Sequence, residues 1–343
     1  MLRKLFILLG EQVFVSTSIG IALTAPGYQR PEDLLRDAET AMYRAKANGK
    51  ARHEIFDNRM HAHVLSLLKL EADLRQALDR QEFCLEYQPI VSLATGKITS
   101  VEALIRWQRP EHGFLYPASF IDEAEDCGLI VPIGAWVLRT ACSQIRLRHQ
   151  AGYKNLGVSV NISARQFYDE DLPRLVKDVL RDSCLPARCL ELEITERVAM
   201  QDVDLTIQTL QELTEIGVKV AMDDFGHGYS ALGYLRRYPL NTLKIDRSFL
   251  SELSEKPEDA GITTAIVAIG HVLHLNVIAE GVETPEQLEF LASQECDHVQ
   301  GFLISRPLPP GELTTLLEAG DILLPETSQG LRFYPNGHKK IGR

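Results

Sequence analysis

The sequence predicts an α/β protein whose main part is a closed (β/α)8 barrel, preceded by a partial α/β segment and a connecting helix. From residue 83 onward, short apolar runs alternate with longer helical patterns, which is the rhythm of repeated βα units around a parallel sheet. Eight such runs occupy about 220 residues, the size of a (β/α)8 barrel. An open doubly wound sheet is the alternative, and it is disfavoured because no Gly-rich dinucleotide loop follows any of the runs.

The composition is that of a folded soluble protein. The 343 residues include 36 Lys and Arg against 47 Asp and Glu, a net charge of −11, which argues against duplex nucleic acid as a partner. Six cysteines are scattered without a CxxC pair, as expected for reduced thiols in the cytoplasm. No stretch approaches the ~18 apolar residues that span a bilayer, so we expect no direct membrane insertion, although a parent protein could be tethered.

The N-terminal segment reads as strand, loop and helix. The apolar start at residues 1–9 is too short for a signal peptide and favours a strand. A second strand is predicted over 13–23 and a helix over 31–46, ended by Asn48-Gly49. Leucines at helical spacing, without Gly or Pro, then predict a connecting helix. The expected divisions are a partial domain (1–56), a linker helix (57–80), the barrel (81–320) and a flexible tail (321–343).

Eight apolar runs are the predicted barrel strands. Their residue ranges are 83–93, 98–107, 156–163, 189–195, 219–225, 242–249, 276–282 and 298–305. Because side chains alternate faces along a strand, residues two apart share a face. This alternation gives each run one apolar face and one face carrying a polar residue. Six strands thereby each contribute one polar residue to the interior, near the carboxyl ends, where barrel enzymes hold their chemistry. These residues are Glu102, Asn161, Glu193, Asp223, Lys244 and Glu280.

The polar interior predicts a divalent metal site. Several carboxylates inside a barrel are costly without positive charge, and Lys244 alone does not balance them. Hard oxygen ligands without a His or Cys pattern select Mg²⁺ or Mn²⁺ over zinc. Asp224 follows Asp223 at a strand end, where both can turn inward, and a shared Asp223 could bridge two cations. The alternative is a set of salt-bridged core carboxylates.

The sequence resembles the EAL-domain cyclic-di-GMP phosphodiesterases over residues ~80 to 320. The segment Glu102-Ala103-Leu104, followed by Ile105-Arg106-Trp107, resembles the family signature. Further segments match in the family's order and spacing, and together they identify the family far more specifically than one triplet does. They are Tyr87-Gln88-Pro89-Ile90-Val91, Val160-Asn161-Ile162-Ser163, Glu193-Ile194-Thr195-Glu196, Asp223-Asp224-Phe225-Gly226, Leu243-Lys244-Ile245-Asp246, Ala279-Glu280-Gly281-Val282-Glu283 and Gln300-Gly301-Phe302.

The resemblance implies an enzyme of bacterial second-messenger signalling that hydrolyses cyclic di-GMP to linear pGpG with two Mg²⁺ or Mn²⁺ ions and is inhibited by Ca²⁺. The implied ligands of one ion are Glu102, Asn161, Glu193 and Asp223. Those of the second are Asp223, Asp224 and Glu280. The implied catalytic residues are Lys244, which holds the attacking water, Glu280 and Glu102. A simple counter-ion role for Lys244 stays open.

The resemblance also implies substrate contacts and loop anchors. The implied substrate-binding residues are Gln88 on the guanine side, Arg106 on a phosphate, Asp246 and Gln300. The implied anchors of the loop after Asp224 are Glu196 and Glu283. A structural salt bridge is the alternative for Arg106, and an acid at a helix start is the alternative for Glu196. His227 departs from the family pattern and is read either as a neutral substitution or as one that alters the coupling of the loop to dimerisation.

The opening residues resemble the C-terminal part of a GGDEF diguanylate cyclase domain, through the segments 16–22 and 37–46. The family's cyclase signature and metal acids are expected upstream of residue 1, so we predict no cyclase activity and expect a fragment of a longer tandem protein with upstream sensory domains. A homodimer through the barrel is a further implied partner. The competing function is a catalytically silent EAL module that acts as a cyclic-di-GMP receptor or protein-interaction domain.

Overall fold

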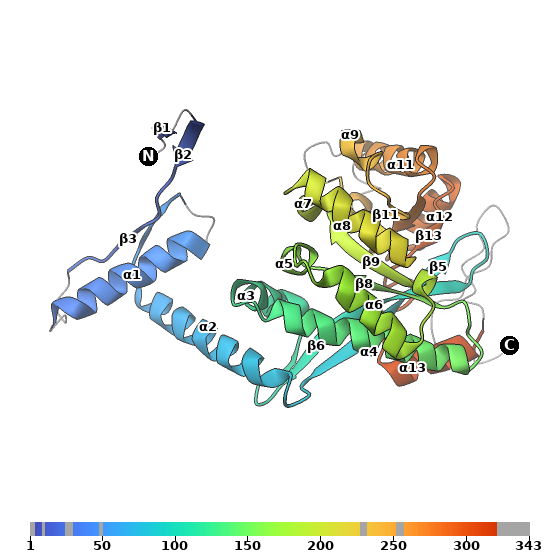
Figure 1. Ribbon diagram of the computed structural model, residues 1–343, viewed down its shortest axis with the longest axis horizontal. Coiled ribbons are helices and arrows are strands. Elements are labelled where there is room, and N and C mark those ends of the chain that lie inside the picture. Colours follow the sequence, from blue (N-terminus) through green and yellow to red (C-terminus); the bar gives the residue numbers. More distant parts are fainter. Residues whose placement is uncertain are drawn as a thin grey trace. The chain divides into compact units, whose positions relative to one another are not determined.

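The computed structural model describes residues 4–8, 11–24, 30–47, 51–226, 232–251 and 257–320. The chain divides into two compact units, Met1–Gln76 and Ala77–Arg343, which are described separately (Figure 1). The expectations for His227 and for the tail 321–343 lie outside the described residues. Among the described helices, none is both long and apolar enough to cross a membrane.

The first unit is a small α/β arrangement. Its elements are β1 (Lys4–Leu8), β2 (Glu11–Val15), β3 (Ile19–Ile21), α1 (Pro31–Ala47), β4 (His53–Ile55) and α2 (Asn58–Ala77). The single strand predicted over 13–23 is wrong, because β2 pairs antiparallel with β1 whereas β3 pairs parallel with β4. Gly20 lets β3 approach α1 closely, since a Cβ atom there would lie 1.9 Å from the Ala38 carbonyl oxygen.

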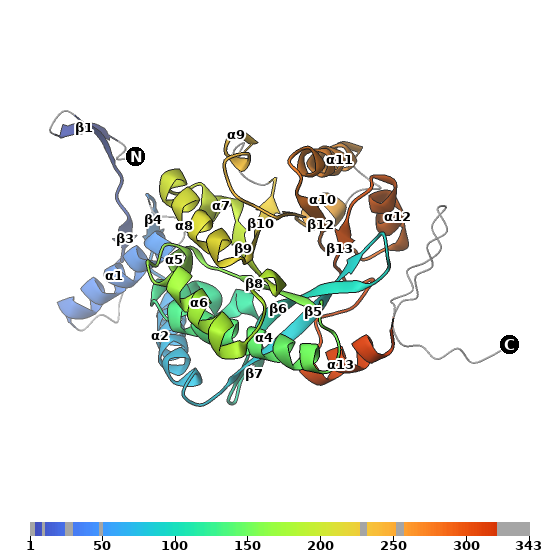
Figure 2. The ribbon, with the colours of Figure 1, turned by 45° about the vertical axis from the view of Figure 1, so that its right-hand side comes forward.

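The second unit is the predicted closed barrel of eight strands (Figure 2). Its strands are β5 (Phe83–Ser92), β6 (Ile98–Arg109), β8 (Gly157–Asn161), β9 (Leu190–Thr195), β10 (Lys219–Phe225), β11 (Thr242–Ile245), β12 (Asn276–Ala279) and β13 (His298–Val299). Neighbours run in the order β5-β13-β12-β11-β10-β9-β8-β6, and the β5–β6 pairing closes the ring. A short strand, β7 (Gly113–Leu115), extends β6 as a hairpin.

The sheet is not wholly parallel, which corrects the sequence-based interpretation. β5 runs antiparallel to both of its neighbours, β6 and β13. Its connection to β6 is a tight turn in which the Ser92 amide donates to the Lys97 carbonyl at 3.0 Å. A parallel pair would need a crossover of a dozen or more residues, so this turn forces the two strands into opposite directions.

The later predicted strands are shorter than expected. β11 ends at Ile245 and residues 248–251 form a helical turn, while β12 ends at Ala279 and β13 has two residues. Backbone hydrogen bonds continue past two of these ends: the Glu280 amide donates to the Ile245 carbonyl at 3.0 Å, and the Gln300 amide donates to the Ala279 carbonyl at 2.9 Å. Polar residues just beyond the formal strands therefore remain part of the barrel wall.

Helices cover the outer face of the barrel (Figures 1 and 2). They are η1 (Pro117–Ser119), α3 (Ile121–Asp126), α4 (Ile130–Gln150), α5 (Ala164–Phe167), α6 (Leu172–Ser183), η2 (Ala187–Cys189), α7 (Glu196–Ala199), α8 (Val203–Ile216), α9 (Leu232–Leu235), α10 (Ser248–Ser251), α11 (Pro257–Val272), α12 (Pro285–Ser293) and α13 (Pro310–Glu318). In α4 the buried residues Ile130, Ile133, Val137 and Ala141 recur at helical spacing, so one stripe faces the sheet. The apolar faces of the strands meet such stripes, which leaves the polar faces inside the barrel.

Candidate active site at the carboxyl end of the barrel

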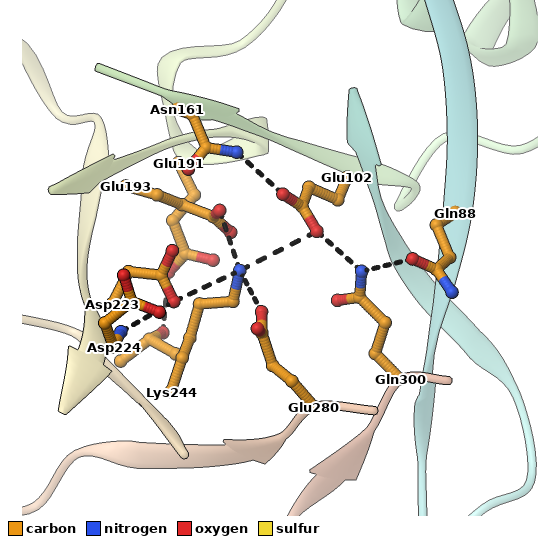
Figure 3. Close-up of polar contacts among 11 residues, drawn as sticks. Gln88, Glu102, Asn161, Glu191, Glu193, Asp223, Asp224, Lys244, Glu280 and Gln300 are labelled. Carbon is orange, nitrogen blue, oxygen red and sulfur yellow. Dashed lines mark hydrogen bonds and ion pairs between the residues drawn. The ribbon is translucent and has the colours of Figure 1, made fainter. Parts of the chain in front are cut away.

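A buried lysine lies at the centre of the predicted polar cluster (Figure 3). Lys244, near the end of β11, is 0% exposed. Its Nζ atom lies 2.7 Å from Glu193 Oε2 and 3.8 Å from both Glu102 Oε2 and Asp223 Oδ1, and it also forms an ion pair with Glu280 Oε1. The four carboxylates come from β6, β9, β10 and the residue just after β12, and all face this one ammonium, as the strand alternation predicted.

Glu102 is held by neutral amides on its other side. Asn161 Nδ2 donates to Glu102 Oε1 at 2.7 Å, and Gln300 Nε2 donates to Glu102 Oε2 at 2.6 Å. Gln300 Nε2 also donates to Gln88 Oε1 at 3.0 Å, while Gln88 Nε2 donates to the Ser305 carbonyl at 3.1 Å. This chain of amides fixes the orientation of the Glu102 carboxylate. The sequence did not predict that Gln88 supports Glu102 through Gln300.

A β-bulge places the two neighbouring aspartates at one edge of the cluster. The pairing register of β10 shifts between Met222 and Phe225, and Asp224 takes a left-handed φ of 54°. The Asp224 amide donates to Asp223 Oδ1 at 2.9 Å. On a regular strand adjacent side chains point to opposite faces, so this bulge is the local reason that the Asp224 side chain lies on the same side as that of Asp223 (Figure 3).

Arg106 and Asp246 have structural partners. Arg106 is 5% exposed, and its Nε donates to Glu86 Oε2 at 2.7 Å. The Arg106 guanidinium also lies over the Tyr116 ring, 5.0 Å from its centroid. The salt bridge that was the alternative for Arg106 is therefore present. Asp246 Oδ1 accepts from the Ser248 amide at 2.9 Å, which stabilises the turn that leaves β11.

The two predicted loop anchors differ in position. Glu196 is buried at the start of α7, and its Oε2 accepts from the Gly226 amide at 3.3 Å, so it contacts the first residue after β10. Glu283 is exposed, and its amide donates to Gln287 Oε1 at 2.7 Å beside the start of α12. The Glu196 contact thus reaches the first residue of the loop, whereas residues 227–231 lie outside the described ranges and the anchoring role of Glu283 stays a prediction.

Burial and charge act in opposite directions on the cluster. Burial raises the pKa of Glu193 well above its ordinary value and that of Glu280 to about 8, with Lys244 opposing the rise and neighbouring carboxylates adding to it. For Glu102, burial is outweighed by Lys244 and by the hydrogen bonds from Gln300 and Asn161, so its pKa lies below the ordinary value. The carboxylates likewise outweigh burial at Lys244 and raise its pKa well above the ordinary value. Lys244 is therefore a charged ammonium.

The donor set fits a divalent cation. In the described part of the chain, no three His, Cys, Asp or Glu side chains are arranged to hold a metal ion as they stand, because the carboxylates turn toward Lys244. Four carboxylates nevertheless surround the Lys244 ammonium, Asn161 donates to one of them, and the buried Glu193 Oε1 lacks a hydrogen-bond partner within the described structure (Figure 3). Carboxylate and amide oxygens are hard donors, which suit a hard divalent cation.

Sequence reasoning passed over one interior acid. Glu191 lies two residues before Glu193 on β9, so it shares the inward face, and its Oε1 accepts from Thr242 Oγ1 at 2.6 Å. The alternation of β9 contained this signal. The pair lies nearer the amino ends of the strands than Lys244 does, because Thr242 is the first residue of β11.

Comparison with known proteins gives consistent matches. The EAL domain family matches residues 71–307, and the diguanylate cyclase GGDEF domain family matches residues 1–52. A Pseudomonas aeruginosa relative, "Bifunctional diguanylate cyclase/cyclic di-GMP phosphodiesterase MucR", is 45% identical over 303 residues, which are 88% of this chain and 44% of the relative. The Escherichia coli relative "Cyclic di-GMP phosphodiesterase PdeR" is 37% identical over 298 residues, 87% of this chain and 45% of the relative.

A solved structure described as "PaMucR Phosphodiesterase, c-di-GMP complex" is 46% identical to this chain, with a TM-score of 0.70 over 71% of this chain and 99% of that one. This chain spans less than half the length of the two curated relatives. The family match nevertheless covers most of its residues and the whole acidic cluster. The chain belongs to the EAL domain family, with a short GGDEF-type segment at its start.

Proposed function

We propose that this chain hydrolyses cyclic di-GMP to linear pGpG with the help of divalent cations. The observation that carries the proposal is the buried Lys244 with Glu102, Glu193, Asp223 and Glu280 around it at the carboxyl end of an eight-stranded barrel. Relatives that match most of this chain are named cyclic di-GMP phosphodiesterases, and a solved phosphodiesterase of similar fold is a complex with cyclic di-GMP.

In the proposed reaction, water adds across one P–O bond of the ring, leaving a phosphate monoester and a free hydroxyl in the linear product. Divalent cations, when bound, neutralise the phosphoryl oxygens and lower the pKa of the attacking water. The acidic cluster would supply the oxygen ligands: Glu102, Asn161, Glu193 and Asp223 would hold one ion, and Asp223, Asp224 and Glu280 the second. Lys244 donates a hydrogen bond that orients the water, and Gln300 keeps Glu102 in place.

The direct test is to incubate the purified chain with cyclic di-GMP and Mg²⁺ or Mn²⁺ and to resolve the products by chromatography. We expect pGpG to accumulate with either ion and not in EDTA. Binding of cyclic di-GMP without any turnover in the presence of either metal would instead identify the chain as a receptor module. The experiment therefore separates the two functions that the family offers.

Ca²⁺ is expected to inhibit. The same carboxylates bind it, but it takes more ligands at longer distances than the compact octahedral Mg²⁺, so the water and the phosphate lose their alignment. Titrating Ca²⁺ against fixed Mn²⁺ should lower the rate progressively. Full turnover with Ca²⁺ as the sole cation would contradict this expectation.

The compartment and the assembly remain predictions. All six cysteines are free thiols in the described structure, which supports a reducing compartment such as the cytoplasm. A homodimer through the barrel and an upstream sensory segment follow from the family resemblance alone. Sedimentation of the purified chain tests the first of these two expectations.

A further inference from the structure

A cavity lies at the amino end of the barrel, opposite the acidic cluster. It has a volume of about 240 Å³ and is lined in part by the first residues of five strands: Gly157, Lys219, Thr242, Asn276 and His298. Because β8 to β13 are mutually parallel, their first residues gather at the amino end, away from the acidic cluster. The inward face that carries Lys244 at one end therefore carries this cavity at the other.

The amino-end cavity is cationic. Arg188, Lys219 and His298 line it from three separate segments, η2, β10 and β13. Glu191 is a carboxylate in the same wall, and the Thr242 hydroxyl donates to it. Two permanent cations thus face one carboxylate, within a chain whose net charge is −11.

The charged groups of the cavity are close enough to influence one another. Burial lowers the pKa of His298, and although Asp297 opposes this, Lys219 lowers it further. Burial raises the pKa of the Cys189 thiol in the cavity wall, and both Arg188 and Lys219 oppose that rise. Arg188 and Lys219 therefore both lie close enough to the Cys189 thiol to lower its pKa.

The polar groups of the cavity retain unused hydrogen-bonding capacity. Over the ranges that the structure describes, neither Arg188 nor Lys219 forms an ion pair, and the buried His298 Nδ1 has no hydrogen-bond partner. Buried ring nitrogens are normally satisfied by protein or by a ligand. The hydroxyl of Ser100 and the amide of Asn276 also line the cavity.

We propose that this cavity binds the phosphate group of a small anion. Donors that converge from three segments suit a tetrahedral anion, whose oxygens point in several directions, better than a planar carboxylate, which one guanidinium satisfies. A volume of about 240 Å³ is many times the ~10–15 Å³ that one water needs on the same measure. Free phosphate or a phosphate monoester of a small metabolite therefore fits, and the cavity is separate from the hydrolysis proposed above.

The test is isothermal titration of the full chain with inorganic phosphate in EDTA. Removing metal ions prevents phosphate from binding at the carboxyl end, where the metal-free carboxylates repel it. We expect saturable binding of one phosphate per chain, weakened roughly tenfold or more in the double variant Arg188→Gln, Lys219→Gln because two charged donors are lost. The matched control is Arg174→Gln, Lys177→Gln, which removes two exposed cations on α6 and should leave the affinity unchanged.

A second variant, Ser100→Leu, keeps both cations and narrows the cavity with an apolar side chain, so it should also weaken phosphate binding. Unchanged affinity in either the double variant or Ser100→Leu would overturn the proposal, as would the absence of saturable binding to the parent chain. A parallel titration with glucose 6-phosphate distinguishes the sources: tighter binding than that of phosphate indicates a metabolite, and equal or weaker binding indicates the free ion. Because metal is absent and no turnover is measured, the result is independent of the proposed hydrolysis.

Discussion

The two ends of the barrel are built from the same strands but hold charge in opposite ways. At the carboxyl end, Lys244 and Glu193 are almost wholly buried and pair with each other. At the amino end, Arg188 and Lys219 are exposed, and no ion pair involves them within the described residues. Two residues along β9, from Glu191 to Glu193, separate one environment from the other.

This difference shows that position along a strand, rather than the strand itself, sets what a charged side chain costs and does. A buried charge is tolerable only with partners in place, so the carboxyl end is a network in which each removal leaves another charge uncompensated. An exposed cation remains hydrated, so its replacement changes the free energy of unfolding little. Substitutions at the two ends should therefore differ in size, and the following experiments measure that difference.

The largest expected difference is in turnover. Glu102→Ala removes the carboxylate that Asn161, Gln300 and Lys244 contact, and we expect hydrolysis to fall by roughly 10²–10³-fold or more. The amino-end double variant Arg188→Gln, Lys219→Gln should retain turnover within about twofold in phosphate-free buffer. Chromatographic assay of pGpG, with circular dichroism to verify folding, gives both values. Near-parental turnover of folded Glu102→Ala would refute the metal-ligand assignment.

The next contrast compares two lysines in stability. In EDTA, Lys244→Met leaves buried carboxylates without their counter-ion and should cost about 3–5 kcal/mol of unfolding free energy. Lys219→Met, at the exposed amino end, should change it by less than about 0.5 kcal/mol. Urea denaturation of both variants and the parent measures the difference. Equal costs would mean that the two ends do not differ in the way proposed here.

The sequence predicted the acidic cluster because its members obey simple alternation. Glu102, Asn161, Glu193, Asp223 and Lys244 each lie on the polar face of an apolar run, and burial of the other face decides their direction. The closed eight-stranded barrel followed from the count and spacing of the runs. Both predictions depend only on local pattern, and local pattern is what a single sequence contains.

Other features were missed. The direction of β5 is set by the short turn at residues 93–97, a local signal that the expectation of a wholly parallel sheet passed over. Two further features depend on contacts between separate segments. The bulge at Asp224 is a register shift between strands that are distant in sequence. The amino-end cavity unites Arg188, Lys219 and His298 from three segments. Its residues form no motif in the sequence, because they come together only in the folded barrel.

The acidic cluster should also give the metal-free protein an unusual pH dependence. The pKa of Glu280 is raised to about 8, so between about pH 5 and pH 8 the folded state binds more protons at this group than the unfolded state does. Its contribution to stability is present at low pH and is lost as the pH rises through the folded-state pKa. Removing the titrating group with Glu280→Gln should remove part of that loss.

The measurement is the melting temperature in EDTA across that pH range. We expect the parent to lose on the order of 5 °C more than Glu280→Gln. His298, whose pKa is lowered, acts in the opposite direction near its ordinary value, and comparing the two proteins cancels its effect. Equal slopes for the two proteins would show that Glu280 does not titrate in this range.

The smallest effect is expected at Ser159, which lies on β8 between Gly157 of the amino-end cavity and Asn161 of the acidic cluster. Its hydroxyl is fully buried and has no hydrogen-bond partner in the described structure. Removing an unsatisfied buried hydroxyl loses no protein contact and relieves its desolvation, so Ser159→Ala should leave the unfolding free energy within about 0.5 kcal/mol of the parent or raise it.

Thr242→Val is the matched control for Ser159→Ala, because its hydroxyl donates to the Glu191 carboxylate at 2.6 Å. That variant leaves a largely buried carboxylate without its donor and should cost about 1–3 kcal/mol. Urea denaturation in EDTA compares the two. If Ser159→Ala costs as much as Thr242→Val, the hydroxyl has a bound partner such as an internal water, and the two ends of the barrel are joined by a polar contact rather than separated by an unpaired one.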